Sequence, residues 1–85
     1  MGRLYSGNLN AFKGACNRLY QMDFAVIVNE FHDAMYRQEC MKVRIEDRAG
    51  NIIIQDTFCH YDVDVLYNTA TAWLNGMADQ LQHWK

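Results

Sequence analysis

Four neighbouring side chains are of the types that do chemistry: Cys59, His60, Asp62 and Asp64. A thiol beside an imidazole can form an activated nucleophile, and thiols, imidazoles and carboxylates are the ligands that zinc prefers. The paired spacing of a zinc site is missing, however, and His32 and His83 lie in distant parts of the chain. No third group is placed to orient His60, so the pattern is typical of a surface histidine beside a half-buried thiol. We therefore predict no catalytic residue, no metal and no cofactor.

Other chemical motifs in the sequence are equally weak. The five glycines are isolated from one another, which excludes the glycine-rich loops that hold phosphates. The adjacent carboxylates Glu46 and Asp47 are explained by the end of a strand, and Asp62 and Asp64 by the start of a helix. A chain of 85 residues also has little room for a deep pocket that excludes water. These observations predict a protein that is not an enzyme.

The composition indicates a folded protein inside a cell. Hydrophobic residues make up 51% of the chain, too many for a disordered protein, and the length allows one domain over residues 1–85. The net charge is -2 and the lysines and arginines are scattered, so direct nucleic-acid binding is not expected. Three widely spaced cysteines, an odd number, favour reduced cytosolic thiols over a disulfide scaffold. No stretch approaches the roughly 20 apolar residues that span a membrane.

Two helices are predicted in the first half of the chain. Over residues 8–22, apolar side chains recur at helical spacing, with Asn8 as the N-cap. Over residues 23–37, Asp23 can cap a second helix, which has an apolar stripe on one face. The segment "FAVIV" in this range is also compatible with a buried strand, because it is partly β-branched. Its length and the polar periodicity after Asn29 favour the helix.

A β-hairpin is predicted next. The stretch "MKVRIED" alternates apolar and polar side chains, "DRAGN" has the residues of a type I turn, and "IIIQDTF" returns as the partner strand. The register that makes one apolar face pairs Ile45 with Ile54, Met41 with Phe58, and Arg44 with Gln55. The same register places Asp56 opposite Val43, on the face meant for the core. Fraying of the strand there is the favoured explanation, and a specific partner for the carboxylate is the alternative.

The last predicted element is a long helix over residues 62–84, with Asp62 as the N-cap and Asp64 in the first turn. Its continuous apolar face is made by Leu66, Ala70, Trp73, Leu74, Met77, Leu81 and Trp84. Because an isolated hairpin is marginal in water, this helix is expected to pack across it. The predicted fold class is α+β: a small single domain with two N-terminal helices, a β-hairpin and a long C-terminal helix packed on it.

Two acidic surfaces with tyrosines are the candidate binding sites. The first lies where the hairpin meets the last helix and consists of Asp56, Tyr61, Asp62 and Asp64. The second lies on the predicted second helix and consists of Glu30, Asp33 and Tyr36. Aromatic side chains set among charges are typical anchors of protein–protein contacts, although tyrosines are also common on α+β surfaces. The residues alone predict a binding module and leave its partner open.

Three stretches of the chain carry a family resemblance: "MGRLYSGNL", "RIEDRAGN" at 44–51 and the closing "ADQLQHWK". Together they resemble the family of early-gene inhibitors of host dGTP triphosphohydrolase (dGTPase) from short-tailed coliphages of the T-seven group. The resemblance implies a protein of the host cytoplasm that binds and inhibits this enzyme and so protects the dGTP pool for phage DNA replication. The enzyme family handles polyanions, which implies that Tyr61, Asp62 and Asp64 face a basic surface of the partner.

The resemblance also bears on the first residues, since Gly2 and Ser6 fit the N-myristoylation pattern. A protein made in bacterial cytoplasm would not ordinarily meet the acylating enzyme, so this match is predicted to be false, and no membrane partner is expected. Two rival functions stay open. One is a small phage interaction module that inhibits a different host protein, such as a polymerase or a defence system. The other is a metal-dependent or thiol-based enzyme centred on Cys59 and His60.

Overall fold

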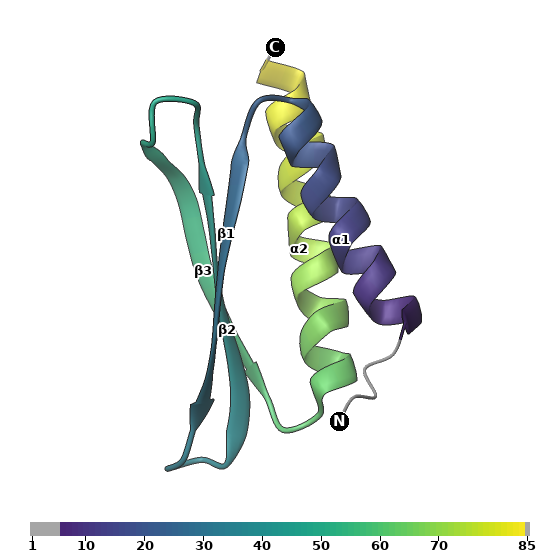
Figure 1. The fold of residues 1–85 in the computed structure, drawn as a ribbon, viewed down its shortest axis with the longest axis vertical. Helices are drawn as coiled ribbons and strands as arrows, with labels where there is room; N and C mark the ends of the chain where they lie inside the picture. Colours follow the sequence, from purple (N-terminus) through teal and green to yellow (C-terminus); the bar gives the residue numbers. More distant parts are fainter. Residues whose placement is uncertain (1–5, 85) are drawn as a thin grey trace.

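The computed structural model describes residues 6–84, which form two helices and a three-stranded sheet (Figure 1). The elements follow the chain as α1 (Ser6–Gln21), β1 (Ala25–Asp33), β2 (Gln38–Glu46), β3 (Ile52–His60) and α2 (Val63–Trp84). The strands pair antiparallel in the order β1-β2-β3, and both helices lie against one face of the sheet. Within residues 6–84, no helix lies over the other face.

The predicted second helix is wrong, because residues 25–33 form strand β1. Asp23, the expected N-cap of that helix, instead ends α1 with a left-handed φ of 71°. The Phe24 N–H donates to the Leu19 carbonyl and the Asp23 N–H donates to the Tyr20 carbonyl, which is the Schellman arrangement of a helix end. The chain therefore leaves α1 in an extended direction, and it pairs its β-branched residues with β2.

Pairing with β2 divides the apolar residues of β1 between two faces. Val26 lies opposite Ile45 and Val28 opposite Val43, on the face that the helices cover. Ile27 and Phe31 alternate to the other face, where they are 42% and 44% exposed. The fold is thus an α+β arrangement with one N-terminal helix, a three-stranded sheet and a C-terminal helix, and the predicted two helices and hairpin are corrected accordingly.

The predicted register of the second hairpin is confirmed. The structure pairs Met41 with Phe58, Val43 with Asp56, Arg44 with Gln55, and Ile45 with Ile54. A bulge follows at Ile45/Glu46, beside the turn. Strand β3 stays paired through His60, so the favoured explanation for Asp56, fraying of the strand, is wrong.

Asp47 organises the turn between β2 and β3. Its carboxylate accepts the N–H groups of Ala49 and Asn51, both at 2.9 Å. These contacts, that of Asn51 first, hold the pKa of the Asp47 carboxyl below its usual range. Gly50 follows with a φ of 89°, a conformation that side chains other than glycine rarely adopt. This turn fixes the register in which β3 returns.

The core lies between the helices and the covered face of the sheet. Met41, Val43 and Ile45 of β2 have no exposed surface, and the residues packed on them from the helices include Leu19, Ala70, Leu74 and Ala78. Phe58 and Trp73 meet edge to face, with ring centroids 5.6 Å apart. The long C-terminal helix is confirmed as the main cover of the sheet.

The two ends of the helical layer differ in part from the predictions. Asp62 caps α2 as predicted, since its carboxylate accepts the Asp64 N–H at 2.9 Å. Helix α1 begins at Ser6, two residues before the predicted N-cap Asn8, which therefore lies inside the helix. The myristoylation motif at Gly2 and the side chain of Trp84 lie outside what the structure describes.

Candidate functional site

Parts of the two predicted acidic surfaces meet at one end of the molecule. The loop 34–37 joins β1 to β2, and the pairing of Glu39 with His60 brings the start of β2 beside the end of β3. The β1–β2 loop and the β3–α2 connection therefore lie at the same end of the sheet, the lower end in Figure 1. We call this region the acidic end and define it by Asp33, Tyr36, Tyr61, Asp62 and Asp64.

Asp33 shapes the first half of the acidic end. Its carboxylate accepts the backbone N–H groups of Met35 at 3.1 Å and Tyr36 at 3.4 Å, which is the geometry of an Asx turn. Arg37 then adopts a left-handed φ of 54° and leads the chain into β2. The loop presents Tyr36 with 69% of its surface exposed. The carboxylate of Asp33 thus supports the loop that carries the aromatic side chain.

The second half of the acidic end is the connection from β3 to α2. The Asp62 N–H donates to Nδ1 of His60 at 2.9 Å, so that this ring nitrogen carries no proton. The ring of Tyr61 meets the His60 ring edge to face at 4.6 Å, yet Tyr61 is 74% exposed. Asp64 lies in the first turn of α2, where a negative charge suits the helix dipole. Tyr61 is therefore an exposed side chain whose ring contacts His60 and whose backbone directly precedes Asp62, the N-cap of α2.

Two of the predicted site residues lie elsewhere. Glu30 lies on the helix-covered face of the sheet, and its carboxylate accepts a short hydrogen bond from the Tyr67 hydroxyl. Burial, together with this carboxylate, raises the pKa of Tyr67 to about 12. Asp56 lies in the middle of β3, where its carboxylate accepts the N–H of Thr57 at 2.8 Å. The predicted grouping of Glu30 with Asp33 is not found, because three residues along a strand lead to opposite faces.

The histidines of the sheet form a row with a glutamate. Nδ1 of His32 lies 2.8 Å from a carboxylate oxygen of Glu39, and Glu39 is paired in turn with His60. Both side chains of this contact are about half exposed, which limits its contribution to stability. Among residues 6–84, no group of three histidine, cysteine or acidic side chains is placed to hold a metal ion.

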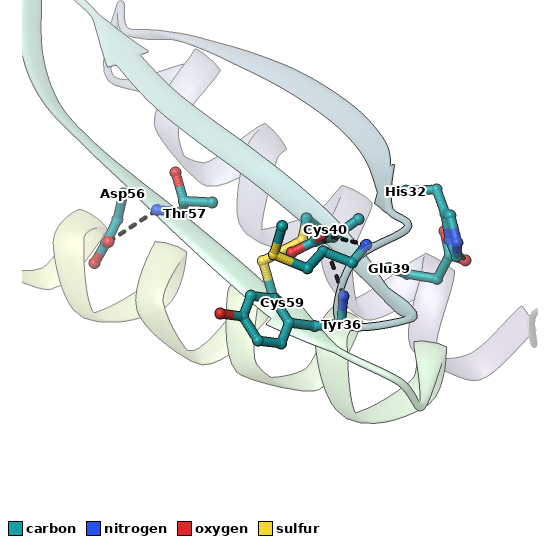
Figure 2. Close-up of a disulfide and its surroundings, with 9 residues drawn as sticks. His32, Tyr36, Glu39, Cys40, Asp56, Thr57 and Cys59 are labelled. Carbon is teal, nitrogen blue, oxygen red and sulfur yellow. Dashed lines mark hydrogen bonds and ion pairs between the residues drawn. A yellow bond between two sulfur atoms is a disulfide. The ribbon is translucent and has the colours of Figure 1, made fainter.

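A disulfide joins Cys40 to Cys59 next to the acidic end (Figure 2). Their Cα atoms are 4.1 Å apart, at directly opposed positions of β2 and β3. The expectation of reduced thiols is therefore wrong for these two residues. Cys59 and His60 are consecutive residues of β3, so their side chains point to opposite faces of the sheet, which separates the nucleophile pair considered from the sequence. Cys16 stays free, and burial raises its pKa.

The sequence contained a signal for this disulfide. The predicted pairing of Met41 with Phe58, continued by one residue, places Cys40 opposite Cys59. Cys40 is only 1% exposed but lies outside the core cluster, and Cys59 is exposed. The bond therefore lies on the face of the sheet that the helices do not cover, in one row with Phe31 of β1. Neither α1 nor α2 combines the length and apolar character needed to cross a membrane.

Comparison with known proteins gives a consistent picture along the whole chain. The model of the family described as "Bacteriophage T7-like, gene 1.2" matches residues 1–85. A protein of Escherichia phage T7 named "Inhibitor of dGTPase" is 59% identical over 85 residues, which cover all of both chains. The "Gene 1.2 protein" of Enterobacteria phage T3 is 40% identical over 90 residues, covering all of this chain and 98% of the relative.

Proposed function

The chain belongs to the gene 1.2 family of T7-like bacteriophages, and we propose that it binds and inhibits the host dGTPase. The observation that carries this function is the 59% identity, over the full length of both chains, to the T7 protein named for that inhibition. The protein is an inhibitor and not an enzyme. By sparing dGTP from hydrolysis, it protects the nucleotide pool on which phage DNA replication depends.

The contacts of the reactive side chains support a role in binding. The sulfur of Cys59 is bonded to Cys40, and the carboxylate of Asp62 caps α2. The carboxylate of Glu30 accepts a hydrogen bond from the Tyr67 hydroxyl, and Nδ1 of His60 accepts one from the backbone N–H of Asp62. Each of these groups has a structural partner, whereas Tyr36 and Tyr61 are mostly exposed. An inhibitor needs only such a surface, because it acts by contact.

We infer that the acidic end is the surface that contacts the enzyme. A dGTPase has to hold a triphosphate, so cationic groups are expected on its functional surfaces. Asp33, Asp62 and Asp64 bring negative charge to such a surface, which favours rapid and selective association. The exposed rings of Tyr36 and Tyr61 are suited to supply most of the affinity as they become buried. For Glu30 and Asp56, which lie away from this end, a contact role stays a prediction.

The setting of this function is the host cytoplasm. We propose that the chain works there as one domain over residues 1–85, with the enzyme as its protein partner. Neither a membrane nor nucleic acid has a part in this function. The cytoplasm is where dGTP and the replicating DNA are found, which supports this location.

A titration tests the proposed function. Purified host dGTPase is assayed for release of deoxyguanosine from dGTP while this chain is added in increasing amounts. We expect activity to fall near stoichiometric ratios. Full activity in the presence of excess folded chain contradicts the proposal. A pull-down from host lysate would then enrich a different protein if the target were a polymerase or a defence system.

A further inference from the structure

We propose that the Cys40–Cys59 disulfide is a redox-reversible clamp on the acidic end, and that its reduction by a dithiol weakens inhibition. The effect on inhibition and the argument from the compartment rest on the proposed function, whereas the position of the bond at the acidic end does not. Three features of the molecule support the clamp: the bond lies at the acidic end, Cys59 is exposed while Cys40 is buried, and the core lies on the other face of the sheet.

The bond joins the strands that carry the two halves of the acidic end. Cys40 lies near the start of β2, just after the loop that presents Tyr36. Cys59 is the penultimate residue of β3, just before the connection that presents Tyr61. Figure 2 shows Tyr36 drawn with the disulfide at this end of the sheet. One covalent bond therefore holds together the ends of two strands whose adjoining loops form the proposed contact surface.

Only one of the two cysteines is open to attack. Cys40 is 1% exposed, whereas Cys59 is exposed on the face without helices. A thiolate of a dithiol reductant can attack Sγ of Cys59, form a mixed disulfide and release the thiolate of Cys40, which takes up a proton. The second thiol of the reductant then displaces Cys59 as a thiol. The protein disulfide gains two electrons and two protons, and the dithiol is oxidised to its own disulfide.

The core does not depend on this bond. The helices pack on Met41, Val43 and Ile45 of β2, all on the opposite face from Cys40. The ladder between β2 and β3 extends from Glu46 to Glu39, past the position of the bond. Reduction should therefore leave the fold intact and loosen only the strand ends and their loops. A binding surface made of two loops loses affinity when its parts are no longer held in place.

The reducing cytoplasm, where the protein is proposed to act, favours a reversible disulfide over a permanent one. Disulfides are rare in reducing compartments, and those that form there are usually transient or redox-sensing. Exposed disulfides are also the more readily reduced ones. A bond with one exposed cysteine, in a protein that acts in the cytoplasm, fits a reversible clamp better than a permanent staple.

The clamp is tested first without the enzyme. The Cys16→Ser variant of the full chain is prepared in oxidised form and after dithiothreitol, so that thiol titration should find no free thiols before reduction and two after it. Hydrogen exchange of the two forms is then compared. We expect amides in residues 34–40 and 58–62 to exchange about tenfold faster in the reduced form, with the amides of α1 and α2 unchanged.

The effect on inhibition is tested with the same two forms. At least about threefold more of the reduced form should be needed to halve dGTP hydrolysis. The Cys40→Ala/Cys59→Ser variant should match the reduced form and be insensitive to dithiothreitol, whereas the Cys16→Ser protein should respond as the natural chain does. Since the dithiothreitol comparison needs no change at Cys40 or Cys59, poor folding of the double variant does not affect the test.

The outcomes separate the two proposals. Equal hydrogen exchange in the oxidised and reduced forms overturns the clamp. Faster exchange in the reduced form with equal potency overturns its effect on inhibition. If neither form inhibits, the proposed function fails together with that effect, while the exchange comparison still supports or overturns the clamp.

Discussion

The hydroxyl of Tyr67 donates a hydrogen bond of 2.5 Å to the carboxylate of Glu30, and so ties α2 to the edge strand β1. Tyr67 is 9% exposed, and its ring meets the Phe12 ring of α1 edge to face at 5.1 Å. One side chain thus connects both helices with the sheet. Glu30, which was predicted to contact a partner, therefore also has a hydrogen-bond partner within the fold.

This contact predicts a change of stability at alkaline pH. Burial and the Glu30 carboxylate raise the pKa of Tyr67 to about 12 from an ordinary value near 10. Since the folded state holds the proton more tightly, the stabilisation is fully present below about pH 10 and is lost as pH rises towards 12. The Tyr67→Phe variant should lose about 1 kcal/mol at neutral pH and show a flatter decline above pH 10. Urea denaturation at several pH values measures both, and parallel curves for the two proteins would argue against the account.

Asp62 allows its charge to be separated from its role as a helix cap. Asparagine is as good an N-cap as aspartate, so Asp62→Asn should leave the free energy of unfolding nearly unchanged, whereas Asp62→Ala should lower it by about 1 kcal/mol. If the charge helps to contact the enzyme, Asp62→Asn should still slow association and weaken inhibition. Denaturation curves and dGTPase titrations of both variants provide the comparison. Inhibition by Asp62→Asn equal to that of the natural chain would remove this charge from the contact surface.

The tyrosines of the acidic end are expected to contribute more than the charges. Tyr36→Ala and Tyr61→Ala should each weaken inhibition by tenfold or more, about 1.4 kcal/mol of binding free energy, with little change in stability. Tyr20→Ala is the matched control, because Tyr20 is 51% exposed and lies near the end of α1, away from the acidic end. The measurement is the inhibition constant of each variant in the dGTP hydrolysis assay, compared with that of the natural chain. Loss of potency in the control alone would place the contact elsewhere.

Two glycines predict opposite effects on stability. Gly14 lies in α1 with open space around the position of a Cβ, so Gly14→Ala should raise the free energy of unfolding by about 1 kcal/mol. Gly50 has a φ of 89°, so Gly50→Ala should lower it by about 1 kcal/mol. Thermal or urea denaturation measures both changes. A stabilising Gly50→Ala would contradict the left-handed turn described for this position.

Strands β2 and β3 and helix α2 were predictable from the sequence, because the pattern of their residues fits only one type of secondary structure. Strand β2 alternates strictly from Met41 to Glu46, and a turn that contains Asp47 and Gly50 leads into β3, so even the register of the two strands could be derived. Helix α2 combines a cap at Asp62 with a continuous apolar face. In both cases local preference and burial favour the same structure, and the structure agrees with the prediction.

Strand β1 could not be derived in this way. Its residues are compatible with a buried strand, but their length and the polar periodicity after Asn29 favoured a helical stripe, with Asp23 as its N-cap. The backbone hydrogen bonds that β2 offers along its free edge decide between them, and those depend on tertiary structure. The error carried over to the site, because a helix would have grouped Glu30 with Asp33 while a strand separates them. Conversely, Asp33 and Tyr36 could be placed beside Tyr61 only once the sheet was known.

The central claim is that the chain inhibits the host dGTPase through its acidic end, and hydrogen exchange of the chain with and without the enzyme tests it most directly. We predict that binding slows the exchange of backbone amides in residues 33–37 and 60–64, while the amides at the opposite end, including the turn at residues 47–51, exchange as in the free protein. Unchanged exchange throughout, or protection confined to that opposite end, would contradict the claim.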